Sequence, residues 1–251
     1  MSMFDLQGKV AIVTGAVTGL GQGMAVGLAQ AGADIVSVGI GDHSETESKV
    51  KALGRRFLGI DANLMSIEPI QGVVDKVVET FGKVDILVNN AGIIRRADAV
   101  DFTEKDWDDV MNINIKTVFF FSQAVAKQMI KQGHGGKIIS VASMLSFQGG
   151  IRVPSYTASK SGVMGVTRLM ANEWAKHNIN VNAIAPGYMA TANTTALRAD
   201  EARNAEIVGR IPAGRWGTPE DLAGPVVFLA SEASDYVSGY TVAVDGGWLA
   251  R

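Results

Sequence analysis

Short apolar runs alternate with longer amphipathic stretches along most of the chain. Each run is rich in valine and isoleucine and nearly continuously apolar at its centre, which is typical of strands covered on both faces of a parallel sheet. We therefore expect strands at residues 9–15, 34–39, 55–61, 83–90, 136–143, 180–187 and 240–247.

The stretches between these runs carry apolar residues at helical spacing. Within residues 155–177, Val163, Val166, Met170 and Trp174 fall on one face of a helix. Seven strands alternating with helices predict an α/β fold, a Rossmann-type doubly wound parallel sheet of seven strands with helices on both faces. The other expected helices lie at residues 19–31, 66–81, 116–131 and 218–231.

Residues 189–216 interrupt this alternation. The segment is polar and follows the carboxyl end of a predicted strand. It is either a surface excursion or a mobile lid over a substrate site, and we expect the lid. No linker or repeat divides the chain, so one domain over residues 1–251 is predicted.

Composition narrows the classes of function. The chain is 47% hydrophobic, which suits a compact protein, and its net charge of −2 comes without a basic stripe, so nucleic acid is not an expected partner. The absence of cysteine excludes disulfides and thiolate catalysis. The three histidines lie far apart without an H-E-x-x-H spacing, so no metal site is predicted. With neither a signal peptide nor a membrane span expected, a cytoplasmic location is predicted.

A glycine-rich turn joins the first predicted strand to the first predicted helix. In "VTGAVTGLGQG", Gly15, Gly19 and Gly21 follow the spacing T-G-x-x-x-G-x-G. Such a turn brings backbone N–H groups and a helix N-terminus close to a bound anion. A glycine triplet alone is also compatible with an ordinary tight turn, but its place after the first strand of an α/β chain predicts a dinucleotide site.

The end of the second predicted strand indicates which dinucleotide binds. An acidic residue there accepts a hydrogen bond from the ribose 2′-hydroxyl of NAD, whereas an arginine favours the 2′-phosphate of NADP. The strand ends in "SVGIGDH", where Gly39 and Ile40 are uncharged, and Thr18 in the glycine turn is not basic. NAD is therefore predicted over NADP. Asp42 is the candidate for the ribose contact, with a solvated loop aspartate as the alternative.

Several further motifs follow in order along the chain. They are "NNAG" (89–92), "NIN" (112–114), Ser143, "YTASK" (156–160), "PGYMAT" (186–191) and the ending "VSGYTVAVDGG". Together with the glycine turn they resemble the short-chain dehydrogenase/reductase family over essentially the whole chain. The Tyr-x-x-x-Lys pair alone would be a weak signal, whereas the ordered set is specific.

The resemblance implies an enzyme that moves a hydride between a nicotinamide dinucleotide and an alcohol. Tyr156 would be the general acid and base, and Lys160, on the same helix face, would lower its pKa and bind the nicotinamide ribose. Ser143 would bind the substrate oxygen, and Asn114 would hold a water that connects the lysine to solvent. The structural alternatives are a surface tyrosine, a helix cap at Ser143 and a helix kink at Asn114.

The same resemblance assigns the path of the cofactor. Asp61 would meet the adenine, unless it is only a turn aspartate, and Thr191 would contact the carboxamide. The cofactor-binding candidates are Gly15, Thr18, Gly19, Leu20, Gly21, Asp42, Asp61, Ala62, Asn89, Ala91, Gly92, Tyr156, Lys160, Pro186, Gly187, Met189 and Thr191.

Cationic and polar residues near the predicted site indicate an acidic substrate. Arg95 and Arg96 follow the fourth predicted strand, and Gln148 and Arg152 precede Tyr156. A guanidinium binds a carboxylate through two parallel hydrogen bonds, so these residues suit a small polyhydroxylated acid. Its reacting oxygen would lie between Tyr156 and Ser143. Solvated loop arginines are the alternative.

At this level the chain resembles the branch of the family that oxidises deoxy and keto-deoxy sugar acids in the breakdown of pectin-type uronates. Branches that act on gluconate or on 3-oxoacyl carrier protein share much of the pattern. A carrier-protein reductase would, however, be expected to use NADPH and to have a basic surface for docking its carrier protein. A non-catalytic dinucleotide sensor is the alternative of another class, and it would be expected to lack Tyr156 or Lys160. The resemblance also implies a homotetramer.

Overall fold

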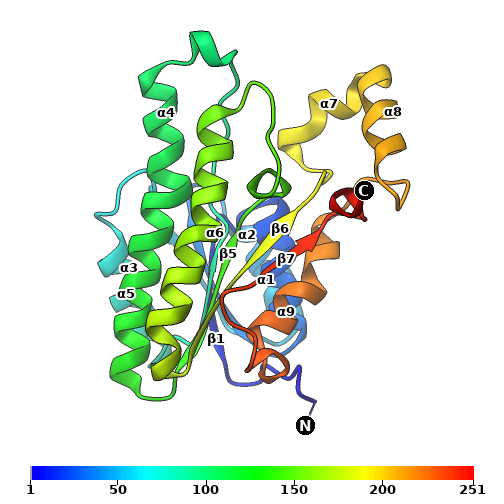
Figure 1. The fold of residues 1–251 in the computed structure, drawn as a ribbon. Helices are drawn as coiled ribbons and strands as arrows, with labels where there is room; N and C mark the ends of the chain where they lie inside the picture. Colours follow the sequence, from blue (N-terminus) through cyan, green and yellow to red (C-terminus); the bar gives the residue numbers. More distant parts are fainter. Residues whose placement is uncertain (1) are drawn as a thin grey trace.

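All seven predicted strands form one parallel sheet with the order β3-β2-β1-β4-β5-β6-β7 (Figure 1). The computed structural model describes residues 2–251. The strands are β1 (Val10–Thr14), β2 (Asp34–Gly39), β3 (Phe57–Asp61), β4 (Ile86–Asn89), β5 (Gly136–Val141), β6 (Ile179–Pro186) and β7 (Thr241–Val244). The predicted Rossmann-type α/β fold is confirmed, with strand ends displaced by only a few residues.

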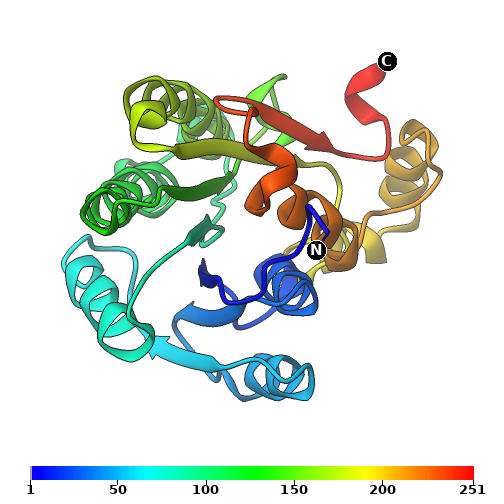
Figure 2. The same ribbon diagram turned by 90° about the horizontal axis from the view of Figure 1, so that it is seen from below.

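Helices cover both faces of this sheet (Figure 2). Successive residues of a strand point to opposite faces. In β1, Ile12 faces the layer of α3, α5 and α6, while Val13 faces the layer of α1 and α9, and both are fully buried. The apolar runs are continuous because each strand contributes to two cores. The helices are α1 (Gly19–Gln30), α3 (Ile70–Phe81), α5 (Thr117–Gln132), α6 (Pro154–Trp174) and α9 (Ala223–Ala230).

Two further helices escaped the sequence analysis, α2 (Ser44–Ala52) and α4 (Glu104–Met111). Each buries very few residues, Thr46 and Val50 in α2 and Val110 in α4. Trp107, Val110 and Met111 do have helical spacing in α4, but over eight residues this pattern is too short to predict a helix. A π-helical segment (Asn112–Lys116) joins α4 to α5. Shorter 3-10 turns lie at Ala99–Asp101, Met144–Ser146, Ala175–His177, Ala192–Thr194, Pro219–Leu222, Glu232–Ser234 and Trp248–Ala250. Among the described residues, no helix combines the length and apolar character needed to span a membrane.

The polar segment 189–216 contains two short helices rather than an extended loop. They are α7 (Thr195–Ala199) and α8 (Glu201–Arg210), and they project beyond the carboxyl edge of the sheet (Figure 1). Ile207 and Ile211 pack against Met144 and Trp248, which lie outside the segment, so a small apolar cluster holds it against the rest of the protein. Its proposed motion as a lid stays a prediction.

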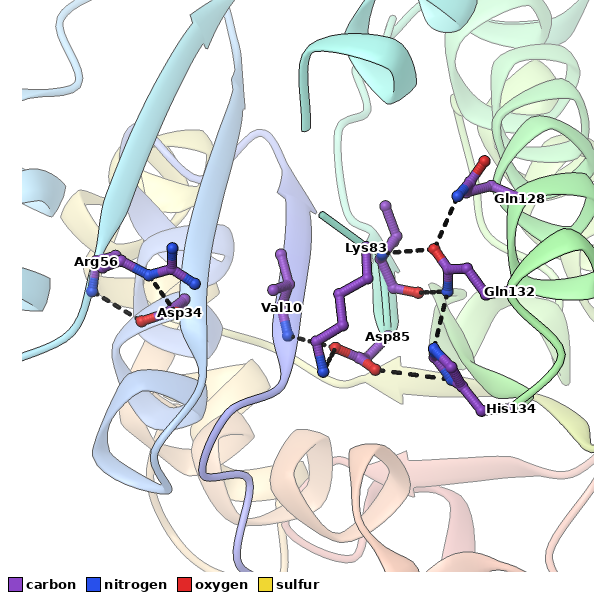
Figure 3. Close-up of polar contacts among 9 residues, drawn as sticks. Val10, Asp34, Arg56, Lys83, Asp85, Gln128, Gln132 and His134 are labelled. Atoms are coloured by element: carbon purple, nitrogen blue, oxygen red, sulfur yellow. Dashed lines mark hydrogen bonds and ion pairs between the residues drawn. The ribbon is translucent and has the colours of Figure 1, made fainter. Parts of the chain in front are cut away.

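The amino edge of the sheet, opposite the predicted site, is held by two buried carboxylates (Figure 3). Asp85 is 4% exposed, accepts a hydrogen bond from the Val10 N–H at 2.8 Å and pairs with Lys83 at 3.0 Å. Asp34 pairs with the Arg56 Nε at 2.8 Å. These contacts join β1 to β4 and β2 to β3 at their starts, and so keep in register the strands whose far ends carry the predicted site.

Candidate active site

The carboxyl ends of neighbouring strands bring the predicted site residues to one edge of the sheet. The glycine turn follows β1, residues 89–92 lie at the end of β4, Ser143 follows β5 and Gly187 follows β6. Because all the strands are parallel, these segments share the edge at which doubly wound sheets bind ligands. The fold therefore unites the predicted cofactor and catalytic residues.

The glycine turn uses its three glycines for different physical reasons. Gly15 and Gly19 have φ angles of 64° and 60°, in the left-handed region that glycine adopts without strain. A Cβ on Gly21 would collide with the Gly15 carbonyl oxygen, so this glycine lets α1 pack against the turn. Around Gly19 the space is open, with no heavy atom within 4 Å of a Cβ position. Thr18 is the N-cap residue of α1 and makes no side-chain cap hydrogen bond, and Leu20 packs against the core.

Asn90, which the sequence analysis did not single out, braces this turn. Its amide nitrogen donates to the carbonyls of Thr14 and Gly15 at 2.9 and 3.1 Å. In return, the Thr14 hydroxyl accepts hydrogen bonds from the N–H groups of Asn90 and Ala91, both at 2.9 Å. The motif "NNAG" contains Asn90, but it does not indicate which of its two asparagines contacts the glycine turn.

Asn89, by contrast, has its side chain in the interior. It is 3% exposed, and its amide donates to the hydroxyls of Ser122 at 2.9 Å and Ser140 at 3.3 Å. Its side chain therefore joins β4 to α5 and β5, away from the open side of the glycine turn. Gly92 lies close to Asn114, whose Oδ1 would be 3.0 Å from a Cβ on the glycine.

Helix α6 and the end of β5 bring together three of the four catalytic candidates, Ser143, Tyr156 and Lys160. Tyr156 and Lys160 lie one turn apart near the start of α6, with the Lys160 Nζ 5.7 Å from the centre of the Tyr156 ring. Lys160 is 4% exposed, and its ammonium donates to the Val141 carbonyl at 2.6 Å. Ser143 is buried, and its oxygen accepts a hydrogen bond from the Leu145 N–H at 3.1 Å.

The electrostatics of this group differ in part from the sequence-based expectation. Burial raises the pKa of Tyr156, and a hydrogen bond with Ser143 and the positive charge of Arg96 act against that rise. Lys160 was expected to lower this pKa, but the groups that lower it are Ser143 and Arg96, and burial lowers the pKa of Lys160 itself to about 8. The Lys160 ammonium donates its hydrogen bond to the Val141 carbonyl.

Asn114 lies in the π-helical segment between α4 and α5 and is completely buried. Its side chain accepts from the Ile93 N–H at 2.9 Å and donates to the Ile93 carbonyl at 3.0 Å. It also donates to the Ser159 hydroxyl at 3.2 Å, and that hydroxyl donates to the Tyr156 carbonyl at 2.9 Å. The helix irregularity expected as the structural alternative for Asn114 is therefore present, and π-helical turns of this kind are frequent at functional sites.

The candidates for the adenosine end lie around the ends of β2 and β3. Asp61 is exposed at the end of β3, opposite Gly39 in the strand register, and the buried Ala62 donates its N–H to the Gly39 carbonyl at 3.1 Å. Asp42 is exposed and accepts from both the N–H and the hydroxyl of Ser44, which lowers the pKa of Asp42. Both carboxylates are therefore available to solvent at the edge that the glycine turn occupies.

The candidates for the nicotinamide end follow β6. Pro186 ends the strand, and Gly187 lies against Asp245, with which any Cβ would clash. Met189 is buried and Thr191 begins the turn that leads into α7. These residues thus connect the sheet to the segment 189–216.

The three arginines proposed for substrate binding differ in their partners. Arg95 pairs with Asp106 and Asp109 at 3.4 and 3.6 Å, and Arg152 pairs with Asp98 at 3.1 Å. Among residues 2–251, Arg96 has no carboxylate within salt-bridge distance, yet its charge acts on Tyr156. Arg96 is exposed and Gln148 is half-buried in the adjoining loop, while Arg95 and Arg152 are paired with carboxylates.

The residues present fit a dinucleotide. The open space at Gly19 and the uncapped start of α1 suit a pyrophosphate, and the Lys160 ammonium keeps two N–H groups beyond its bond to Val141. When bound, the nicotinamide ring would supply the hydride acceptor or donor. Among residues 2–251, no group of three or more histidine, aspartate or glutamate side chains is placed to hold a metal ion.

Comparison with known proteins identifies the class. Residues 15–249 match the family described as enoyl-(acyl carrier protein) reductase. With the fold and the Ser–Tyr–Lys arrangement, this shows that the chain belongs to the short-chain dehydrogenase/reductase family and is an oxidoreductase that uses NAD(P).

Particular relatives are close. The chain is 73% identical over 251 residues to the 2-dehydro-3-deoxy-D-gluconate 5-dehydrogenase of Escherichia coli strain K12, covering 100% of this chain and 99% of that protein. It is 72% identical, with the same coverage, to the enzyme of that name from Dickeya dadantii strain 3937. A solved structure from Agrobacterium tumefaciens, described as a proposed 2-deoxy-D-gluconate 3-dehydrogenase with bound NADP, is 55% identical with a TM-score of 0.94, covering 100% of both chains.

The buried ammonium of Lys160 makes a testable contribution to the pH dependence of stability. The pKa of Lys160 is about 8 in the folded protein, whereas the ordinary value of 10.5 applies in the unfolded chain. Between these two pH values the unfolded chain binds more protons than the folded protein. The free energy of unfolding therefore rises with pH in this range. From pH 8 to 10 we expect the cofactor-free protein to gain about 2–3 kcal/mol relative to Lys160→Met. Urea denaturation of both proteins at the two pH values measures this gain, and equal pH slopes would contradict it.

Proposed function

We propose that this protein catalyses the reversible NAD(P)-dependent oxidation of a secondary hydroxyl on a keto-deoxy sugar acid of the 2-dehydro-3-deoxy-D-gluconate type. The observation that carries the proposal is the joint position of Ser143, Tyr156 and the carboxylate-free Arg96 at one edge of the sheet. The names of the closely related enzymes support the same substrate class. A place in uronate and pectin breakdown is part of the proposal. A 2-deoxy-D-gluconate would likewise present a carboxylate and secondary hydroxyls.

In the proposed mechanism, Tyr156 takes the proton of the substrate hydroxyl as hydride leaves the carbon, and returns it in the reverse reaction. The Ser143 oxygen already accepts from the Leu145 N–H, so its own hydrogen is available to the substrate oxygen, where it stabilises developing negative charge. The positive charge of Arg96 favours the phenolate form of Tyr156. The ammonium of Lys160 would use its remaining N–H groups on the nicotinamide ribose.

Asn114 supports the position of the proposed catalytic residues. By bonding Ile93 and Ser159 it connects the segment after β4 to the first turn of α6, where Tyr156 lies. We propose that it also holds the water through which Lys160 exchanges protons with solvent. That water would let the tyrosine be reset after each turnover.

Arg96 is the proposed carboxylate-binding residue. Arg95 and Arg152 each have an acidic partner, so their charges are engaged, while the guanidinium of Arg96 has none among the described residues. A substrate carboxylate on Arg96 would place the rest of a six-carbon acid toward Ser143 and Tyr156. Gln148 is the proposed polar contact to a substrate hydroxyl.

NAD is the proposed preferred dinucleotide. The turn after β2 presents the exposed Ile40 and an ionised Asp42 but no cation, so nothing there would neutralise a 2′-phosphate. Because the Agrobacterium tumefaciens structure is described with bound NADP, we propose that this protein also uses NADP, at a lower rate than NAD.

A cytoplasmic homotetramer is the proposed assembly. Strand β7 is an edge strand, and Leu169 of α6 and Tyr240 beside β7 are 48% and 64% exposed, which are features that an interface would cover. Light scattering would show four chains in solution, and a single-chain mass would refute the assembly.

The substrate assignment is tested by steady-state kinetics with keto-deoxy hexonates, gluconate and a 3-oxoacyl thioester, each with both dinucleotides. We expect the highest kcat/KM with 2-dehydro-3-deoxy-D-gluconate and NAD, followed by its NADP reaction. A higher value with gluconate would favour a gluconate 5-dehydrogenase. Dinucleotide binding without turnover of any alcohol or ketone would favour a sensor.

The role of Tyr156 is tested by Tyr156→Phe, which removes only the hydroxyl. Loss of a positioned general acid and base is expected to lower kcat by a factor of about 100 to 10,000 while leaving the Kd for NADH nearly unchanged. Stopped-flow rates and fluorescence titration measure the two quantities. A variant with a rate near that of the wild type would show that another group transfers the proton.

The role of Arg96 is tested by Arg96→Met, with Arg152→Met as the matched control. Loss of a charge-assisted contact is expected to raise the KM for the sugar acid by about 10- to 100-fold, with little change for Arg152→Met. Because Arg96 also lowers the pKa of Tyr156, the pH profile of oxidation should move to higher pH in the Arg96 variant. The same KM increase in both variants would contradict a specific carboxylate contact.

A further inference from the structure

Helix α2 is bonded directly to the glycine turn through one buried side chain. Thr46 is completely buried, and its hydroxyl donates to the Ala16 carbonyl at 2.8 Å. The same hydroxyl lies 3.3 Å from the Val17 carbonyl oxygen. The hydroxyl oxygen accepts a hydrogen bond from the Gln22 amide at 2.9 Å. The same Gln22 nitrogen lies 3.1 Å from the Val17 carbonyl, so α1 and α2 together satisfy both carbonyls of the turn.

These bonds determine which way the peptide groups of the turn face. In a planar trans peptide the C=O and the following N–H point in opposite directions. With the carbonyls of Ala16 and Val17 held toward α2 and Gln22, the N–H groups of Val17 and Thr18 face the other way. Within residues 2–251, neither of these N–H groups donates a hydrogen bond to the chain. They are left for a ligand.

We propose that Thr46 is a positioning residue for the cofactor: its hydroxyl orients the Ala16–Val17 and Val17–Thr18 peptide groups so that their N–H groups bind the dinucleotide pyrophosphate. The inference rests on the proposed binding of a dinucleotide at the glycine turn. It gives α2 a role in nucleotide binding although none of its side chains needs to touch the nucleotide. Preorganised N–H groups bind an anion better than groups that must first reorient.

The alternative is that Thr46 only fills space between α2 and the turn. Two substitutions separate these roles. Thr46→Val keeps the shape and branching of the side chain but removes the hydroxyl, whereas Thr46→Ser keeps the hydroxyl and loses a methyl group. A packing role predicts the greater damage from serine, and a positioning role predicts it from valine.

The test is calorimetric titration of ADP-ribose, which contains the pyrophosphate, and of adenosine, which does not. For Thr46→Val we expect the Kd of ADP-ribose to rise about tenfold and the Kd of adenosine to stay within about twofold. Thr46→Ser should remain within about twofold of wild type for both ligands. In kinetics, the valine variant should have a raised KM for NAD with a nearly unchanged kcat.

Lys49→Met is the matched control, because it removes the 2.7 Å contact from the Lys49 ammonium to the side-chain Oε1 of Gln22 while leaving the Thr46 hydroxyl in place. It should bind ADP-ribose like the wild type. If Thr46→Val does not fold, Gln22→Met takes its place, since it removes the second donor to the Val17 carbonyl. We expect that variant to raise the Kd of ADP-ribose about threefold, again without an effect on adenosine.

Three results would overturn the inference. An unchanged Kd for ADP-ribose in Thr46→Val would show that the hydroxyl does not matter. An equal loss for ADP-ribose and adenosine would show that Thr46 supports the fold rather than the turn. Failure of the folded wild-type protein to bind ADP-ribose would refute the dinucleotide site itself, and so is distinguishable from the first two results.

Discussion

A buried ammonium ion organises the catalytic half of this site. Lys160 is nearly inaccessible, and the described chain offers it a carbonyl, that of Val141 at 2.6 Å, but no carboxylate within salt-bridge distance. A charge in such surroundings is tolerated only if hydrogen bonds are held in place around it. The start of α6 must therefore stay at the end of β5, and the bond from the Ser146 hydroxyl to the Lys160 carbonyl, at 2.6 Å, ties the two a second time. Ser143 lies between these two ties, so its position relative to Tyr156 follows from them.

In the cofactor half, the carbonyls of the glycine turn accept hydrogen bonds from the protein, while the N–H groups of Val17 and Thr18 donate to no acceptor within residues 2–251. Four successive carbonyls, those of residues 14–17, accept hydrogen bonds from side chains elsewhere in the chain. Asn90 bonds the first two, Thr46 the third and Gln22 the fourth. With their oxygens engaged on the protein side, the peptide groups of the turn are oriented before any ligand arrives. The glycines allow the backbone conformation of the turn, and these amide and hydroxyl groups determine which way its peptide groups face.

The sequence predicts the parts of this molecule that have a strong local pattern. The strands and the helices α1, α3, α5, α6 and α9 emerge from apolar periodicity, and Ser143, Tyr156 and Lys160 emerge from ordered motifs. Helices α2 and α4 do not, because each meets the rest of the protein through very few buried residues. Asn90 and Thr46 were missed for a different reason. They act on residues about 75 and 30 positions away in the chain, and no local pattern reports such a contact.

The arginines show why substrate recognition is harder to predict than chemistry. All three have the same functional group and lie near the site in sequence, and only their acidic neighbours in space distinguish them. Arg152 adopts a φ of 64°, which is unusual for a residue with a side chain, and its carbonyl accepts the Ala97 N–H at 3.2 Å. This bond and the ion pair from Arg152 to Asp98 join two loops beside Tyr156, and Arg96 lies in the first of them. The proposed proton-transfer groups thus lie on a strand end and a long helix, while the residues proposed to bind the acid lie on two loops that are bonded to each other. Loop residues change more readily than strand ends and helices, so the same chemistry can serve different acids when these two loops change together.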